Sequence, residues 1–161
     1  MIFVTVGTHE QQFNRLVRAV DDFVADGTLD DSIFIQTGYS DYQPTHCEWS
    51  RFLPATEMES WMRGADVVVT HGGPSSFIEA MSMGKVPVVV PRRFEYGEHV
   101  NDHQANFVRE VAERKGGIVP LFDVADLPSA ISKARAASSD CVFRSHNASF
   151  CTDLYRLISK L

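Results

Sequence analysis

The sequence predicts a three-layer α/β fold in which helices cover both faces of a parallel β-sheet. Short apolar runs alternate along the chain with segments of helical periodicity, as such a fold requires. No internal repeat, low-complexity tract or interdomain linker interrupts this alternation. The 161 residues are enough for one domain with a substantial apolar core. We therefore expect residues 1–161 to form a single Rossmann-like domain.

The first half of the chain contains three predicted strands and two predicted helices. The strands are residues 2–6, 32–36 and 67–69. Between the first two strands, apolar residues from Phe13 to Val24 recur at helical spacing, which predicts an amphipathic helix. Thr56 and Glu59 have the spacing of a capping box, so a second, short helix is expected to begin there and to end at Gly64.

The second half continues the alternation. Its predicted helices are residues 75–83, 104–114 and 126–137, followed by a tail helix after about residue 138, and its predicted strands are residues 86–90 and 118–120. Gly84 closes the first of these helices, Gly116 and Gly117 close the second, and Asp126 caps the third. The apolar residues that make the tail amphipathic are Leu154, Leu157, Ile158 and Leu161.

Composition excludes several classes of function. A net charge of -6 argues against a nucleic-acid partner, because phosphate contacts need a basic surface. Three cysteines without CxxC spacing indicate a reducing compartment and neither a disulfide framework nor a zinc site. The first residues do not resemble a signal peptide, and no apolar run approaches the ~20 residues of a membrane span. Membrane association would therefore depend on a partner or an amphipathic surface.

Ligands of a parallel sheet bind beyond the carboxyl ends of its strands, where the strand order reverses. The loops expected at that edge are residues 7–9, 38–42, 71–76 and 92–102. The third loop has the clearest pattern. Gly72 and Gly73 permit a sharp turn and the close approach of an anion, and Pro74 suits the first position of a helix.

The helix that begins at Pro74 predicts a nucleotide site. The N–H groups of Ser75 and Ser76 would point at an anion, and the positive end of the helix dipole would reinforce them. The serine hydroxyls and His71 add further donors, so this diphosphate cradle needs no metal. Glu79 shares the helix face of the two serines, and its carboxylate can accept both hydroxyls of a ribose.

The same residues also have a purely structural interpretation. Gly-Gly-Pro turns join strands to helices in many α/β proteins that bind no ligand at the turn. Glu79 would then be a solvated helix residue, and His71 a histidine whose hydrogen bonds are satisfied in the core. The combination of a phosphate-sized turn with a diol acceptor one helical turn later favours the nucleotide site.

A second polar cluster, residues 92–104 (RRFEYGEHVNDHQ), follows the next predicted strand and so lies at the same edge. Its candidate sugar-binding residues are Asn101, Asp102, His103 and Gln104, which offer donors and acceptors to sugar hydroxyls. A helix N-cap explains Asn101 or Asp102 equally well. Arg92 and Arg93 either bind a phosphate or a sugar carboxylate, or belong to a solvated loop.

The segments THGGPSSFIEAMSMGKVPVVVPR and GEHVNDHQ together resemble the donor-binding half of GT-B glycosyltransferases, of the family 28 C-terminal domain type. The opening FVTVGT and the NDHQ segment are most similar to free-standing C-terminal halves. These include the catalytic subunit of the dolichol-linked N-acetylglucosamine transferase and exopolysaccharide glycosyltransferase subunits of the PssE/EpsF type. The resemblance covers residues 1–121 and implies a single C-terminal-type GT-B domain.

The resemblance assigns a role to each matching position. The expected ligands of the donor diphosphate are Gly7, Thr8, His71, Gly72, Gly73, Ser75 and Ser76. Glu79 is expected to bind the ribose, and Phe52 and Leu53 to hold the uracil through their backbone groups. The expected sugar-binding residues are Asn101, Asp102, His103 and Gln104. Neither a metal nor another cofactor is expected.

The resemblance also implies inverting transfer of a sugar from a UDP-sugar to a lipid-linked saccharide, in exopolysaccharide or glycan-precursor biosynthesis. In complete enzymes the N-terminal half binds the acceptor and supplies the general base. We therefore expect a separate, membrane-associated N-terminal-half subunit, with this chain cytoplasmic, peripheral at the inner membrane face and poorly active alone. On this chain His9 and Glu10 are the candidate bases, and residues 149–161 are the candidate docking segment.

Other enzyme classes lack their motifs here. The sequence has no DxD triplet of a metal-dependent GT-A site, no dehydrogenase GxGxxG after the first strand, no P-loop and no complete GxSxG elbow. Two alternatives remain: a non-catalytic, nucleotide-sugar-binding regulatory module, and a UDP-sugar epimerase or hydrolase on the same scaffold. Glucose, galactose, glucuronic acid and N-acetylglucosamine all remain open as the sugar.

Overall fold

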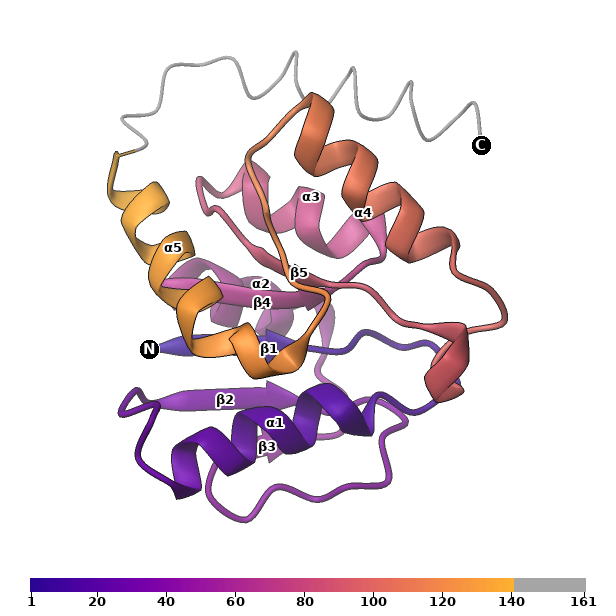
Figure 1. Ribbon diagram of the computed structural model, residues 1–161. Coiled ribbons are helices and arrows are strands. Elements are labelled where there is room, and N and C mark those ends of the chain that lie inside the picture. The colour runs from indigo at the N-terminus through magenta and orange to yellow at the C-terminus, as the bar shows by residue number, and fades with distance from the viewer. Residues whose placement is uncertain (141–161) are drawn as a thin grey trace.

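The computed structural model describes residues 1–140 and contains a six-stranded, entirely parallel sheet (Figure 1). In spatial order the strands are β3 (Glu48–Ser50), β2 (Ile33–Gln36), β1 (Ile2–Thr5), β4 (Val67–His71), β5 (Val88–Val90) and β6 (Val119–Pro120). The five predicted strands are therefore confirmed, with ends that differ by up to two residues. The strand order reverses between β1 and β4, so a crevice is expected outside their carboxyl ends.

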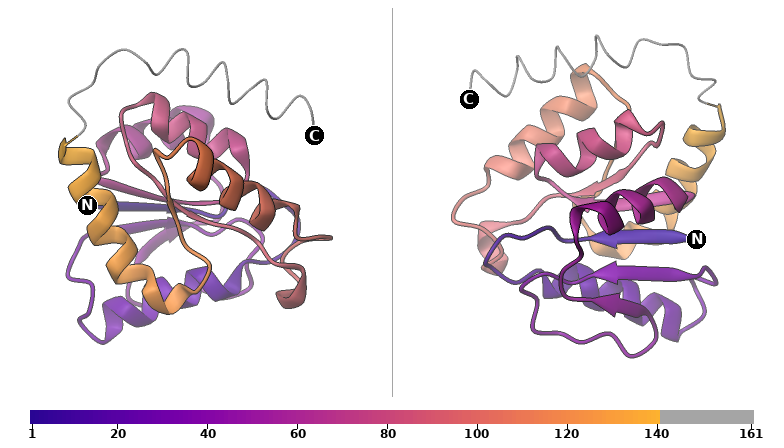
Figure 2. Two further views of the ribbon diagram at one scale, coloured as in Figure 1. Left: turned by 45° about the horizontal axis from the view of Figure 1, so that its top comes forward. Right: turned by 180° about the vertical axis from the view of Figure 1, so that it is seen from behind.

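Helices cover both faces of the sheet, which confirms the three-layer fold (Figure 2). The helices are α1 (Asn14–Ala25), α2 (Ala55–Gly64), α3 (Pro74–Ser82), α4 (His103–Arg114) and α5 (Leu127–Asp140). Successive strand residues point to opposite faces. Val67 and Val69 therefore join the core beneath α1 and α5, whereas Val68 packs on the opposite face with Met62 of α2. Within residues 1–140, no helix has the length and apolar character that crossing a bilayer requires.

One strand was not predicted, and one local prediction was wrong. Strand β3 was not predicted, because Glu48-Trp49-Ser50 is a short, largely exposed edge strand with no apolar run. The capping box of Thr56 and Glu59 does not form. Helix α2 begins after Pro54 and has no side-chain cap within the described chain, and the Glu59 carboxylate instead accepts a hydrogen bond from Arg63, at 2.7 Å.

The cap predicted at Asp126 also differs from the structure. Asp126 lies in a 3-10 turn, η2 (Val124–Asp126), directly before α5, and Asp123 caps this turn by accepting a hydrogen bond from the Ala125 N–H. A further 3-10 turn, η1 (Phe94–Tyr96), follows β5. The predicted tail helix and the docking segment at residues 149–161 lie outside the described residues.

Asp21 anchors the long loop that follows β2. Its buried carboxylate accepts hydrogen bonds from the backbone N–H groups of Thr45, His46 and Cys47 and from the Tyr42 hydroxyl. Burial raises the pKa of Asp21, but these hydrogen bonds outweigh burial and hold the pKa well below its ordinary value of 3.8.

Replacing Asp21 with asparagine is expected to lower the free energy of unfolding by about 2–3 kcal/mol at pH 7. Because folding lowers the pKa, the wild-type advantage is complete above pH 4 or so and declines as the pH falls below that value. Urea unfolding at pH 7 and at lower pH measures both effects. Asn in place of the exposed neighbour Asp22 is the control, and an equal loss in both variants would contradict the anchoring role.

Candidate nucleotide-sugar site

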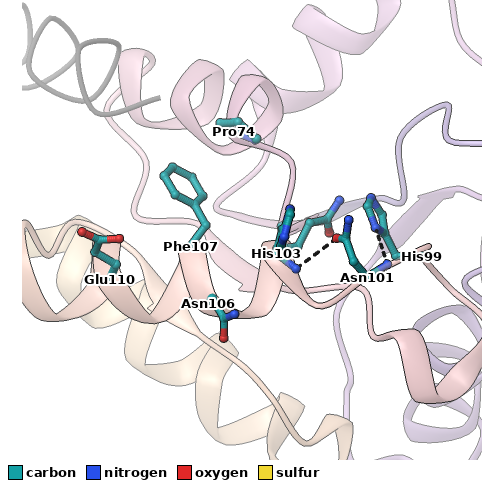
Figure 3. A pocket seen from close by; sticks show the side chains of 9 residues that line it. Pro74, His99, Asn101, His103, Asn106, Phe107 and Glu110 are labelled. Carbon is teal, nitrogen blue, oxygen red and sulfur yellow. Dashed lines mark hydrogen bonds between the residues drawn. The ribbon is translucent and has the colours of Figure 1, made fainter. Parts of the chain in front are cut away.

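A pocket of about 520 Å³ opens at the carboxyl edge of the sheet, between the amino end of α3 and the first turns of α4 (Figure 3). Its lining residues are Gly72, Pro74, His99, Asn101, His103, Gln104, Asn106, Phe107 and Glu110. His103 and Phe107 project from α4 toward Pro74 of α3. The turn after β4 and the loop after β5, which sequence analysis singled out separately, therefore meet at one site.

The amino end of α3 is arranged as a donor-rich terminus. Pro74 occupies the first turn, and Gly73 is the N-cap residue with an extended backbone. No side chain among the described residues caps this helix, so a ligand can reach its first N–H groups. Ser75 is exposed, and Ser76 is half-buried with its hydroxyl 3.1 Å from His71 Nε2.

His71 lies between the loops that follow β1 and β4. The Gly73 N–H donates to His71 Nδ1 at 2.9 Å, so both ring nitrogens have partners. A Cβ on Gly7 would come within 2.5 Å of His71 Nε2, and a Cβ on Gly73 would overlap the ring. Burial, followed by the neighbouring charge of Arg92, lowers the pKa of His71 to about 3, which keeps the ring neutral at physiological pH.

The loop after β1 is fixed by Gln36, which sequence analysis missed. The buried side-chain amide of Gln36 accepts from the Gly7 N–H and the Thr5 hydroxyl. It also donates to the carbonyls of Gly7 and Arg51. Two of these four hydrogen bonds hold Gly7, in the predicted phosphate-binding loop, and the exposed Thr8 follows it. A polar residue at the end of an apolar strand was the available signal.

Arg92 corrects both sequence-based interpretations, because it is neither solvated nor turned toward the pocket. Its guanidinium is fully buried and donates to four carbonyl oxygens, those of Val6, Gln11, Gln12 and Glu98, at 2.8–3.2 Å. It thereby joins the loop after β1 to the loop after β5.

Two further residues of the loop after β5 form ion pairs within the protein. Arg15 of α1 forms a bidentate pair with the buried Glu98 carboxylate, at 3.0 and 2.9 Å. Arg93 pairs with Glu95 at 2.8 Å and also approaches Asp102. Ion pairs to Arg15 and Arg93 therefore help to hold the loop that leads to the pocket.

The predicted sugar-binding cluster is only partly directed at the pocket. Asn101 Oδ1 accepts from the His103 N–H at the start of α4, and Gln104 Oε1 accepts from the Arg92 N–H. Asp102 does not line the pocket. Its carboxylate accepts from the Phe94 N–H, so it fixes the loop instead.

The remaining predicted ligands lie outside this pocket. Glu79 is exposed on α3. Phe52 is 42% exposed and makes an edge-on contact with Tyr39, and its carbonyl accepts from the Ser50 hydroxyl. Leu53 packs against the core. The ribose and uracil sites at these positions therefore stay predictions.

The candidate bases differ in their surroundings. The His9 ring stacks on His99, which lines the pocket, at 4.8 Å between centroids, and His9 Nε2 lies 3.0 Å from Gln11 Oε1. Glu10 is exposed on the same loop. Burial, followed by the charge of His9, lowers the pKa of His99. His9 is therefore adjacent to the pocket through His99.

Four pocket residues were not predicted from the sequence: His99, Asn106, Phe107 and Glu110. His103, Phe107 and Glu110 are spaced i, i+4 and i+7, so they share one face of α4. Phe107 and Glu110 could therefore have been predicted from their helical spacing relative to His103. Among residues 1–140, no group of three or more His, Cys, Asp or Glu side chains is placed to hold a metal ion.

This chain is similar in sequence to a known glycosyltransferase. A curated relative from Bdellovibrio bacteriovorus is UDP-N-acetylglucosamine--N-acetylmuramyl-(pentapeptide) pyrophosphoryl-undecaprenol N-acetylglucosamine transferase. It is 26% identical over 126 residues, which cover 74% of this chain and 34% of the relative.

Two solved structures support the fold. The glycotransferase of kitacinnamycin matches with a TM-score of 0.63 and 20% identity, over 86% of this chain and 36% of the other. CalG4, the calicheamicin glycosyltransferase, matches with a TM-score of 0.56 and 19% identity, over 86% of this chain and 35% of the other. The chain thus spans about a third of the length of these relatives.

The match to a family model is more extensive. Residues 1–147 match the model described as the glycosyltransferase family 28 C-terminal domain, which is nearly the whole of the sequence. The family assignment made from the residues around the turn after β4 and the start of α4 is therefore confirmed: this chain belongs to the glycosyltransferase family 28 C-terminal domain family.

Proposed function

We propose that this chain is the donor-binding domain of an inverting glycosyltransferase that takes its sugar from a UDP-sugar. The observation that carries this proposal is the pocket between the amino end of α3 and the start of α4, in a chain of the family 28 C-terminal domain. The pocket has a helix amino terminus for an anion on one side. On the other side, amide, imidazole and carboxylate groups and an aromatic ring line a cavity large enough for a hexose.

In this proposal the diphosphate binds at the amino end of α3. The N–H and hydroxyl groups of Ser75 and Ser76 donate to its oxygens, and Glu79 accepts from the ribose hydroxyls. The sugar enters the pocket, where Asn101, His103 and Gln104 face its hydroxyls. The uracil lies toward the end of β3, near the backbone of residues 52–53. No metal is required, because the helix terminus supplies the positive potential.

The proposed reaction forms a bond between an acceptor hydroxyl oxygen and the anomeric carbon as the bond to the β-phosphate oxygen breaks. UDP departs with the bonding electrons, and the α3 terminus stabilises the negative charge that builds on it. The acceptor's proton passes to a general base. We assign that base to the acceptor-binding half of the enzyme, with His9 as the candidate on this chain and the exposed Glu10 ranked below it.

We further propose that the acceptor is a lipid-linked saccharide and that a membrane-associated subunit binds it. The named activity of the bacterial relative, transfer to a pyrophosphoryl-undecaprenol substrate, supports the first part. The similarity of the FVTVGT and NDHQ segments to free-standing C-terminal halves supports the second. The chain would then act at the cytoplasmic membrane face, in exopolysaccharide or glycan-precursor biosynthesis.

Calorimetric titration of the wild-type chain with UDP tests the donor site, and an absence of binding would refute it. Glu79→Ala is expected to weaken UDP binding about tenfold or more, because two hydrogen bonds to a carboxylate are lost. Ala in place of the exposed Glu113 of α4 is the matched control and is expected to leave UDP affinity unchanged.

Turnover separates the proposal from its alternatives. The isolated chain is expected to bind UDP and to transfer little sugar, and robust turnover by the chain alone would count against a two-component enzyme. Combined with its acceptor-binding partner, Glu79→Ala should abolish transfer. Intact transfer would indicate a regulatory module instead, and product analysis would reveal an epimerase or a hydrolase.

A further inference from the structure

The hydrogen bonds around His71 determine which of its nitrogens carries the proton. The backbone N–H of Gly73 can only donate, so His71 Nδ1, at 2.9 Å, must present its lone pair. A neutral imidazole carries one N–H, which is therefore on Nε2. His71 Nε2 lies 3.1 Å from Ser76 Oγ, so the histidine donates and the serine oxygen accepts.

This direction has a consequence for the Ser76 hydroxyl. Because Ser76 Oγ accepts a hydrogen bond from His71 Nε2, the Ser76 hydroxyl hydrogen cannot point toward Nε2. The hydroxyl can therefore donate to another acceptor. Ser76 is the third residue of α3 and is half-buried, among the N–H groups that open the helix. Its O–H is thereby added to the donors already available there for an anion.

The His71 ring has little freedom to change this arrangement. Gly7 and Gly73 both lie close to the ring, and a Cβ at either position would collide with it. Charged or titratable groups that face His71 are Arg92, His9 and His99, all of which disfavour an imidazolium. Burial acts in the same direction and lowers the pKa of His71 to about 3.

We propose that His71 is a positioning residue: as a neutral ring it orients the Ser76 hydroxyl toward an anionic oxygen of the nucleoside diphosphate and does not bind that anion itself. This inference rests on the donor site proposed above and deepens it. It replaces the expectation that His71 contacts the diphosphate directly. The imidazole serves as a fixed, uncharged donor that also closes the turn at Gly73.

A double-mutant cycle on UDP affinity tests the proposal. His71→Asn places an amide near the Nδ1 position and can keep the turn, but it cannot reach Ser76. It is expected to weaken UDP binding about tenfold in the wild-type background and less than about twofold in a Ser76→Ala background. If His71 contacts the anion directly, the two losses are independent and His71→Asn weakens binding equally in both backgrounds, which would overturn the proposal.

His71→Gln supplies the rescue arm, because its longer side chain can bring an amide N–H to the position of Nε2. It is expected to retain more UDP affinity than His71→Asn, and a greater loss would contradict the orienting role. Circular dichroism and thermal unfolding of all variants confirm that each is folded. The double-mutant cycle can be interpreted only if the wild-type protein binds UDP. Absence of that binding refutes the donor site and this inference together, whereas additive losses refute the inference alone.

Nitrogen NMR of wild-type protein labelled at histidine tests the protonation state of His71 on which the proposal depends. His71 is expected to show a protonated Nε2 and an unprotonated Nδ1, and to keep this pattern between about pH 5 and pH 8. Addition of UDP should leave the tautomer unchanged. The opposite tautomer, or protonation of both nitrogens when UDP binds, would show that His71 meets the anion as a donor or a cation in its own right.

Discussion

Replacing Arg92 with methionine is expected to lower the free energy of unfolding by about 3–5 kcal/mol. The guanidinium is fully buried and donates to four backbone carbonyls, and it lies 4.7 Å from the centre of the Phe13 ring. Burial lowers the pKa of Arg92 to about 10, so the group is still charged at pH 7. Methionine fills part of the volume but leaves the carbonyl oxygens without their donor.

Arg93→Met is the matched control, because Arg93 is the adjacent arginine and its ion pairs with Glu95 and Asp102 are partly exposed. Exposed pairs contribute little, so a loss of about 1 kcal/mol or less is expected. Urea unfolding followed by circular dichroism measures both variants. Normal stability in Arg92→Met together with lost UDP binding would return Arg92 to the role of a phosphate ligand.

The central strands were predictable because their signal is local and strong. β1, β4 and β5 are buried on both faces and therefore read as continuous apolar runs. β3 has no such signal, because an edge strand with exposed Glu48 and Trp49 is specified by its pairing with β2 rather than by its own composition. The turn after β4 was also predictable, since glycine and proline act through the local backbone.

The supports of the site were not predictable, because they join groups that are distant in sequence and use backbone atoms. Arg92 bonds to the carbonyls of Gln11 and Gln12, about 80 residues earlier, and any residue at those positions presents the same carbonyl. Gln36 holds Gly7 in the same way. A sequence pattern identifies which residues can do chemistry but not which of them face inward. It therefore left Arg92 open between a ligand contact and a solvated loop, whereas its guanidinium is buried against backbone carbonyls.

Gly7→Ala is expected to lower the free energy of unfolding by more than the strain of its backbone conformation alone. Gly7 has a φ of +75°, and an L-residue in that left-handed conformation costs about 1–2 kcal/mol. In addition, the new Cβ would lie 2.5 Å from His71 Nε2. The ring has little room to move, because it also lies close to Gly73 and both of its nitrogens have hydrogen-bond partners. We expect a total loss of about 3–5 kcal/mol in the free energy of unfolding.

Gly27→Ala separates the two causes. Gly27 has a φ of +77°, so it carries the same backbone strain, but no heavy atom of the described chain lies within 4 Å of its Cβ position. Gly27→Ala should therefore lower the free energy of unfolding only by the cost of the backbone strain, about 1–2 kcal/mol, and should keep full UDP affinity.

Gly7→Ala should weaken UDP binding at least tenfold, because moving the His71 ring also moves the Ser76 hydroxyl. Adding His71→Asn to Gly7→Ala should recover part of the stability, since the smaller side chain leaves room for the Cβ, but none of the affinity. Equal stability losses in Gly7→Ala and Gly27→Ala, with UDP binding intact in both, would mean that the ring is not confined, and the orientation of Ser76 would then lose its physical basis.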